Sequence, residues 1–142
     1  MERFENVVDK FIESIEAGDS EAFAALFAED AVGHHPLYPE PVRGREAIRQ
    51  SEQALFDAFS DISVDVRSVL VDGDRSALEV VIEAVNTGPL DLGEGEPVPA
   101  TGRTVALPAS WWLDLGPDDL IVETRDYLDT ATFLRQLGLE AT

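Results

Sequence analysis

The chain has 142 residues with 44% apolar content, which fits one globular domain with a single core. Its 29 acidic and 10 basic residues give a net charge of −19, which argues against partners such as nucleic acid or an anionic membrane. It contains no cysteine, which excludes disulfides, thiol catalysis and thiolate metal sites.

No apolar run approaches the roughly 20 residues that span a bilayer. The first residues also lack the basic and apolar segments of a secretory signal. We therefore expect a cytoplasmic protein. The acids are spread along the chain, which indicates a solvated acidic surface. This surface serves either solubility or adaptation to high salt, because ions screen repulsion between like charges. Lys10 is the only lysine, and this scarcity resembles proteins of salt-accumulating halophiles.

The N-terminal part predicts two helices. Apolar residues recur at helical spacing from Phe4 to Ile15, and Gly18 is the expected C-terminal cap of this first helix. Asp19 or Ser20 then caps a short second helix.

A short extended piece and a third helix follow. Residues 31–35 are expected to be extended, and the three prolines in residues 36–41 exclude a helix there. Gly44 opens a third helix at roughly residues 45–59, whose apolar positions include Ile48, Leu55 and Phe56.

Beyond Asp61 the apolar period changes to two, which predicts strands. A first strand begins at Ile62 and ends at the Asp72-Gly73 turn, and a second covers residues 77–85. A loop rich in glycine and proline occupies residues 88–99, and a third strand covers about 101–115.

The last strand covers residues 120–129, and Asp129 or Thr130 caps a final helix at 133–137. Three helices followed by consecutive antiparallel strands indicate an α+β fold in one domain, residues 1–142. We expect a strongly curved antiparallel sheet packed by the three N-terminal helices, which together form a cone with an internal pocket.

The last strand carries the main candidate for chemistry. Side chains alternate between the two faces of a strand. The face with fewer charges is the expected inward face: Val122, Thr124, Asp126 and Leu128. A carboxyl group among apolar neighbours has a raised pKa and suits general acid/base catalysis. Alternatively, Asp126 hydrogen-bonds a neighbouring strand or pairs with Arg125 or Arg103.

Two adjacent tryptophans lie on the third strand. The odd positions of this strand are the more apolar ones, so Trp111 faces inward unless a bulge near Pro108 shifts the register and turns Trp112 inward instead. One of the two must face away from the core. An exposed tryptophan on a sheet marks an interface, and we therefore expect a homodimer joined through the outer face of the sheet.

Four sequence motifs span nearly the whole chain. They read FIESIEAGD at residues 11–19, FAEDAV at 27–32, GREAI at 44–48, and RDYLD followed by LRQLG at 125–138. Together they resemble the SnoaL-like polyketide cyclases and ester cyclases of the nuclear-transport-factor-2-like superfamily.

The resemblance implies specific roles for several residues. In the cyclases, an aspartate at the position of Asp126 is the acid/base of an intramolecular aldol ring closure. His34 lies in VGHHP, which is similar to a family pattern whose histidine reaches the pocket. The cyclases also carry a histidine on the penultimate strand, where this chain has Trp112.

Asp126 and His34 are thus the catalytic candidates, and four residues are candidates for substrate binding: His35, Tyr38, Trp111 and Trp112. His34 is otherwise a half-exposed loop residue, and Tyr38 a packing residue in a proline-rich loop. No metal and no cofactor are expected, because two adjacent histidines on a strand point to opposite faces.

We expect a cofactor-free enzyme that acts on a hydrophobic, carbonyl-bearing small molecule, in the manner of a cyclase or isomerase. Asp126 would move a proton beside the carbonyl, and His34 or Tyr38 would stabilise the oxyanion. The alternative is a non-catalytic ligand-binding or dimeric scaffold protein of the same fold.

Overall fold

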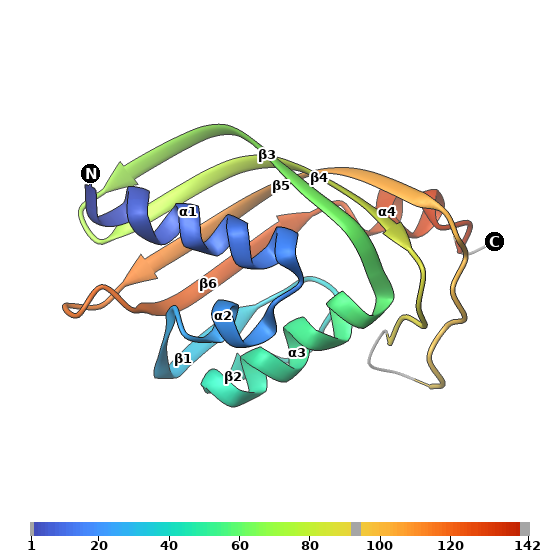
Figure 1. The fold of residues 1–142 in the computed structure, drawn as a ribbon, viewed down its shortest axis with the longest axis horizontal. Coiled ribbons are helices and arrows are strands. Elements are labelled where there is room, and N and C mark those ends of the chain that lie inside the picture. The colour runs from blue at the N-terminus through green and yellow to red at the C-terminus, as the bar shows by residue number, and fades with distance from the viewer. Residues whose placement is uncertain (1, 92–94, 140–142) are drawn as a thin grey trace.

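The computed structural model describes residues 2–91 and 95–139. Its elements follow in this order: α1 (Glu2–Ala17), α2 (Ser20–Ala24), β1 (Phe27–His34), β2 (Val42–Arg43), α3 (Arg45–Ala58), β3 (Phe59–Asp72), β4 (Arg75–Asn86), β5 (Thr104–Leu115), β6 (Ile121–Leu128) and α4 (Thr130–Gln136). The predicted helices and long strands are all present (Figure 1), which confirms the α+β class.

The six strands form one sheet in the order β2-β1-β6-β5-β4-β3. The long strands β3 to β6 pair antiparallel, as predicted. β1 and β6 are parallel, however, so the expectation of a purely antiparallel sheet is wrong. The reason is the connection between them: α3 and three long strands separate β1 from β6, and no tight turn forces opposite directions.

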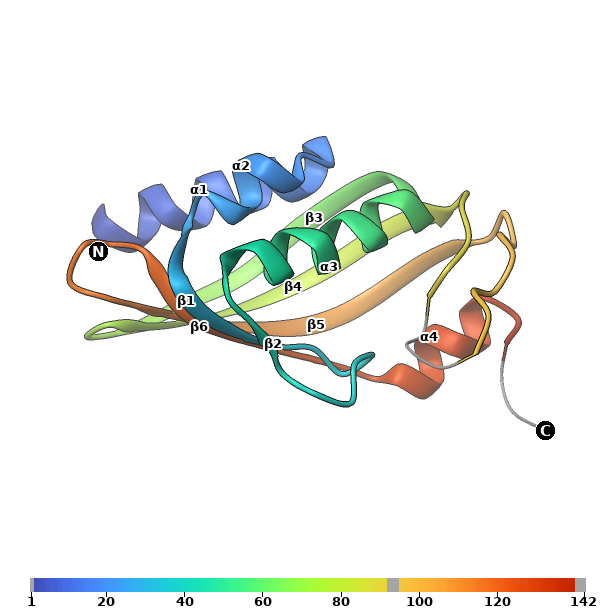
Figure 2. The same ribbon diagram turned by 90° about the horizontal axis from the view of Figure 1, so that it is seen from below.

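The three N-terminal helices lie together on one side of the curved sheet (Figure 2). The apolar stripe of α1 is buried from Phe4 to Ile15 and packs in one core cluster with residues of β4, β5 and β6. The C-terminal helix α4 lies at one end of the sheet, where Phe133 and Leu137 belong to a second cluster. No helix among residues 2–91 and 95–139 is long and apolar enough to span a membrane.

The helix ends follow the sequence signals. Gly18 has a φ of +65°, the left-handed conformation expected after α1. Asp19 is the N-cap of α2 and accepts a backbone hydrogen bond from its first turn at 3.0 Å. Asp129 accepts hydrogen bonds from the backbone N–H groups of Ala131 and Thr132. Because this cap lies so early, α4 begins before the predicted residue 133.

The two tryptophans of β5 face opposite sides of the sheet. Trp111 is buried in the core, whereas Trp112 is half-buried on the other face. The register between β4 and β5 runs without interruption through Pro108, so no bulge shifts the faces. Trp111 is therefore the inward tryptophan.

A bulge changes the start of β6. One extra residue, Val122, lies where β6 pairs with the end of β5. The bulge buries Ile121 completely and leaves Val122 36% exposed, so the prediction that Val122 faces inward is wrong. Beyond the bulge the predicted inner face is confirmed by three residues that line an internal cavity: Thr124, Asp126 and Leu128.

The loop predicted at residues 88–99 is described only in part, because residues 92–94 lie outside the described residues. Its two sides are joined by a bridge between Leu90 and Val98. Gly88 is required where the loop leaves β4, since a Cβ atom there would lie 1.9 Å from the carbonyl oxygen of Asp57.

Candidate active site

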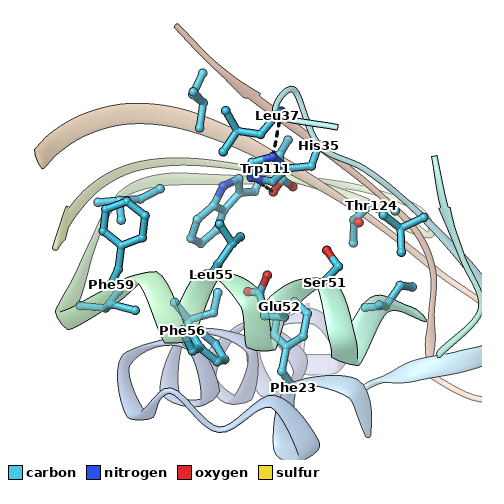
Figure 3. A pocket seen from close by; sticks show the side chains of 18 of the residues that line it. Phe23, His35, Leu37, Ser51, Glu52, Leu55, Phe56, Phe59, Trp111 and Thr124 are labelled. Carbon is cyan, nitrogen blue, oxygen red and sulfur yellow. Dashed lines mark hydrogen bonds and ion pairs between the residues drawn. The ribbon is translucent and has the colours of Figure 1, made fainter. Parts of the chain in front are cut away.

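A cavity of about 150 Å³ lies between the helices and the concave side of the sheet (Figure 3). Its lining is largely apolar and rich in aromatic residues: Phe11, Phe23, Phe27, Phe56, Phe59, Trp111 and Phe133. Its titratable side chains are Glu52, Asp126, His34 and His35, and none of the described residues that line it is a lysine or an arginine. An apolar space of this size holds a ligand about as large as benzene.

Strand β6 positions Asp126 on the cavity wall, paired in register with Trp111 of β5. Its side chain keeps only 24% of its surface accessible. Among the described residues neither Arg103 nor Arg125 forms an ion pair with it, and Arg125 pairs with Asp114 at 3.2 Å instead. Burial raises the pKa of Asp126 to about 7. The carboxyl group therefore exchanges its proton near neutral pH.

The structure brings His35, and not His34, next to Asp126. Nε2 of His35 lies 3.8 Å from Oδ2 of Asp126, slightly more than a hydrogen-bond length. His34 is part of the cavity lining, but its Nε2 is bonded to Oε2 of Glu123 at 2.7 Å. The family pattern pointed to His34 as the catalytic histidine and left His35 as a candidate for substrate binding. Neighbouring residues of an extended chain point to opposite sides, and the residue that faces Asp126 is His35.

The charge and tautomer of His35 follow from its surroundings. Burial lowers its pKa to about 4, so the ring is neutral at pH 7 and its contact with Asp126 is not an ion pair. The backbone N–H of Leu37 donates to Nδ1 at 3.2 Å. Because Nδ1 accepts this bond, the neutral ring carries its proton on Nε2, which faces Asp126.

Glu52 is a cavity residue that the sequence reasoning missed. Helix α3 turns it toward the cavity beside Leu55 and Phe56 (Figure 3). Burial raises its pKa to about 8, and the charge of Asp126 adds to this shift. A signal was present in the sequence: Glu52 follows Ile48 by four residues and so interrupts the apolar stripe of α3.

Two predicted substrate-binding residues lie outside the cavity lining. Trp112 is on the outer face of the sheet and donates from Nε1 to Oγ of Ser110 at 3.1 Å. Tyr38 packs against the ring of His35, with 5.4 Å between ring centroids, and its hydroxyl donates to the carbonyl oxygen of Ser51 at 3.5 Å. Trp111 and His35, by contrast, both line the cavity.

No group of three or more His, Asp or Glu side chains in the part of the chain that the structure describes is arranged to hold a metal ion. The polar side chains of the cavity lining are the carboxyl groups of Glu52 and Asp126, the imidazoles of His34 and His35, and the hydroxyls of Ser51 and Thr124.

Helices on the concave side of a curved mixed sheet, enclosing an apolar cavity with a few polar groups, define a nuclear-transport-factor-2-like domain. The sequence profile of the SnoaL-like domain matches residues 8–124, and the chain belongs to this family. The matched region ends just before Asp126, so it leaves out the C-terminal motif that contains this residue. None of the curated protein sequences matches the chain.

Solved structures share the fold. A putative SnoaL-like polyketide cyclase from Jannaschia sp. CCS1 has a TM-score of 0.83 at 19% identity, over 98% of this chain and 94% of its own. A putative polyketide cyclase from Xanthomonas campestris pv. campestris has a TM-score of 0.76 at 25% identity, over 96% and 97%. SalBIII, an epoxide hydrolase/cyclase-like enzyme of pyran ring formation in salinomycin, has a TM-score of 0.71 at 18% identity, over 90% and 91%.

Proposed function

We propose that this protein is a cofactor-free acid/base enzyme that acts on a small, hydrophobic molecule with a carbonyl group. The observation that carries the proposal is Asp126: a carboxyl group on the wall of an apolar cavity, without an arginine partner among the described residues and with a pKa near 7. A base with such a pKa is about half ionised at neutral pH, which favours proton transfer to and from carbon.

In this proposal Asp126 removes a proton from the carbon beside the carbonyl group. The apolar lining holds the hydrocarbon part of the substrate and excludes water from the reacting atoms. His35 presents its Nε2–H beside Asp126 and orients the carboxylate when it is ionised. Ring closure and isomerisation both begin with this proton transfer, and putative polyketide cyclases among the structural relatives fit such chemistry.

Proton exchange tests this function without knowledge of the natural substrate. The probes are three ketones of about the size of benzene: 2-butanone, cyclopentanone and cyclohexanone. In D₂O the protein should speed the loss of their α-proton NMR signals, and Asp126→Asn should reduce exchange to the buffer rate. Glu46→Gln is the control, because Glu46 is exposed and pairs with Arg49. Binding of the ketones without faster exchange of any of them would overturn the enzyme proposal and favour a ligand-binding protein.

A further inference from the structure

Glu52 is a second acid in the same cavity, and it comes from the opposite wall. Asp126 lies on strand β6 of the sheet. Glu52 points from helix α3 into the space between the helices and the sheet (Figure 3). Among the described residues its carboxyl group has no hydrogen-bond or ion-pair partner, whereas Glu46 on the same helix is bound by Arg49. Glu52 is half-buried, and a carboxyl group that loses water without gaining a partner is costly, so it calls for an explanation by function.

The two acids share one electrostatic environment. The other titratable groups that line the cavity are His34 and the neutral His35, and Tyr38 lies behind His35 with a pKa that is raised chiefly by burial. No lysine or arginine of the described lining opposes their charge. Burial raises the pKa of both acids, and the charge of Asp126 raises that of Glu52 further, so Asp126 ionises first and Glu52 keeps its proton.

We propose that Glu52 is the catalytic acid that gives a proton to the substrate's carbonyl oxygen while Asp126 takes the proton from the neighbouring carbon. This role rests on the proposed function and names the substrate class of the same site, an uncharged ketone with a C–H bond beside the carbonyl group.

The proton and electron balance of the step is closed within the cavity. The C–H bond breaks, its proton goes to the Asp126 carboxylate, and its electron pair forms the C=C bond of an enol. The π electrons of the carbonyl group move to its oxygen, which takes the proton of the Glu52 carboxyl. Asp126 ends neutral and Glu52 ends as a carboxylate, so the pair carries one negative charge before and after. The apolar cavity never has to hold an additional charge, which would be costly there.

The other polar side chains that line the cavity are less suited to give a proton to the carbonyl oxygen. His34 is bonded to Glu123, and neutral His35 lies beside the base on the same side of the cavity. The hydroxyls of Ser51 and Thr124 can donate a hydrogen bond but are far too weak as acids to give up a proton. Glu52 is the group in the described lining whose proton is available near neutral pH.

Ketone exchange in D₂O tests the role of Glu52, with Glu52→Gln set against Glu46→Gln. The wild-type rate should rise as Asp126 ionises and fall as Glu52 loses its proton, with a maximum between pH 7 and pH 8. Glu52→Gln should lower the maximum about 100-fold, the lower end of a general-acid contribution, and remove the fall at high pH. Glu46→Gln should keep the wild-type profile.

The outcomes separate this proposal from the proposed function. If no ketone exchanges faster than in buffer, the enzyme itself is refuted. If exchange needs Asp126 but Glu52→Gln keeps the wild-type rate and pH profile, only the acid role of Glu52 is refuted. A ¹³C NMR titration gives a readout without turnover. The Glu52 carboxyl should titrate near pH 8, and Asp126→Asn should lower this midpoint because the charge of Asp126 is gone. A midpoint near the ordinary 4.5 would overturn the proposal.

Discussion

Asp114 and Asp126 lie on neighbouring strands, but on opposite faces of the sheet, and their surroundings differ in one respect. Both are largely buried, with side chains 16% and 24% exposed. Asp114 on the outer face binds Arg75 at 2.8 Å and Arg125 at 3.2 Å. Asp126 faces a cavity whose described lining has no arginine. Two carboxyl groups of similar exposure thus have different partners: two arginines bind Asp114, whereas Asp126 has no such partner among the described residues and burial raises its pKa.

The largest expected effect concerns Glu52 on the cavity side. Its folded-state pKa of about 8 exceeds the ordinary 4.5, so the native state binds an extra proton and loses stability as pH rises between these values. Glu52→Gln removes this loss. We expect Glu52→Gln to raise the free energy of unfolding by about 3 kcal/mol at pH 9 and to give no gain at pH 4. The gain at pH 9 is smaller than the roughly 5 kcal/mol that corresponds to the full shift of the Glu52 pKa.

Urea unfolding at both pH values measures this gain, with Glu46→Gln as the control. Glu46 is exposed and has a pKa that is lowered by its hydrogen bond with Arg49, so its removal should give no gain at high pH. Equal effects of Glu52→Gln at pH 4 and pH 9 would show that the cavity does not perturb this acid.

Added salt should stabilise the protein by screening the charges of its outer surface and should have little effect on the carboxyl groups in the cavity. The net charge of −19 destabilises the compact state by self-repulsion in dilute buffer. Because the Debye length falls from about 30 Å at 0.01 M to about 3 Å at 1 M, we expect KCl to stabilise the fold by about 2 kcal/mol, or roughly 6 °C in Tm. A Tm that is flat or falls with KCl would leave solubility as the reason for the acidic surface.

The outer face should also join two copies of the chain. Trp112 is half-buried there, and the most exposed large apolar side chains of the described residues include Leu70 at 71% and Tyr127 at 56%. We expect a homodimer through this face and a weakening of its affinity by about tenfold or more in Trp112→Ala, because aromatic residues dominate interfaces. Light scattering that finds a monomer at micromolar concentration contradicts this expectation.

The smallest expected effect is that of Asp114→Asn. This is the same substitution as Asp126→Asn, made on the outer face of the sheet instead of in the cavity. It weakens charge-assisted hydrogen bonds to Arg125, so we expect a loss of about 1 kcal/mol at pH 8. Asp126→Asn should instead stabilise the protein at pH 8, because it removes a carboxylate that lacks an arginine partner. Urea unfolding of the two variants tests whether their effects on the free energy of unfolding have opposite signs. The same sign for both would show that the arginine partners do not distinguish the two carboxyl groups.

Most helices and strands could be predicted from the sequence because short-range patterns of residues determine them. The apolar stripe from Phe4 to Ile15 predicted α1, and Asp19 and Asp129 marked helix starts that the structure confirms. The period of two predicted the long strands, and the lower charge of one face of β6 predicted that Asp126 faces inward. Each of these signals depends on neighbours within a few residues.

The sequence by itself thus determined the α+β class, the family and the inward position of Asp126. Tertiary structure decided the parallel pairing of β1 with β6, the bulge at Val122, the choice of His35 over His34, and the meeting of Glu52 with Asp126 across the cavity. The physical reason is range: the pKa of a carboxyl group depends on the charges and water around it in space, and these come from strands and helices far apart along the chain.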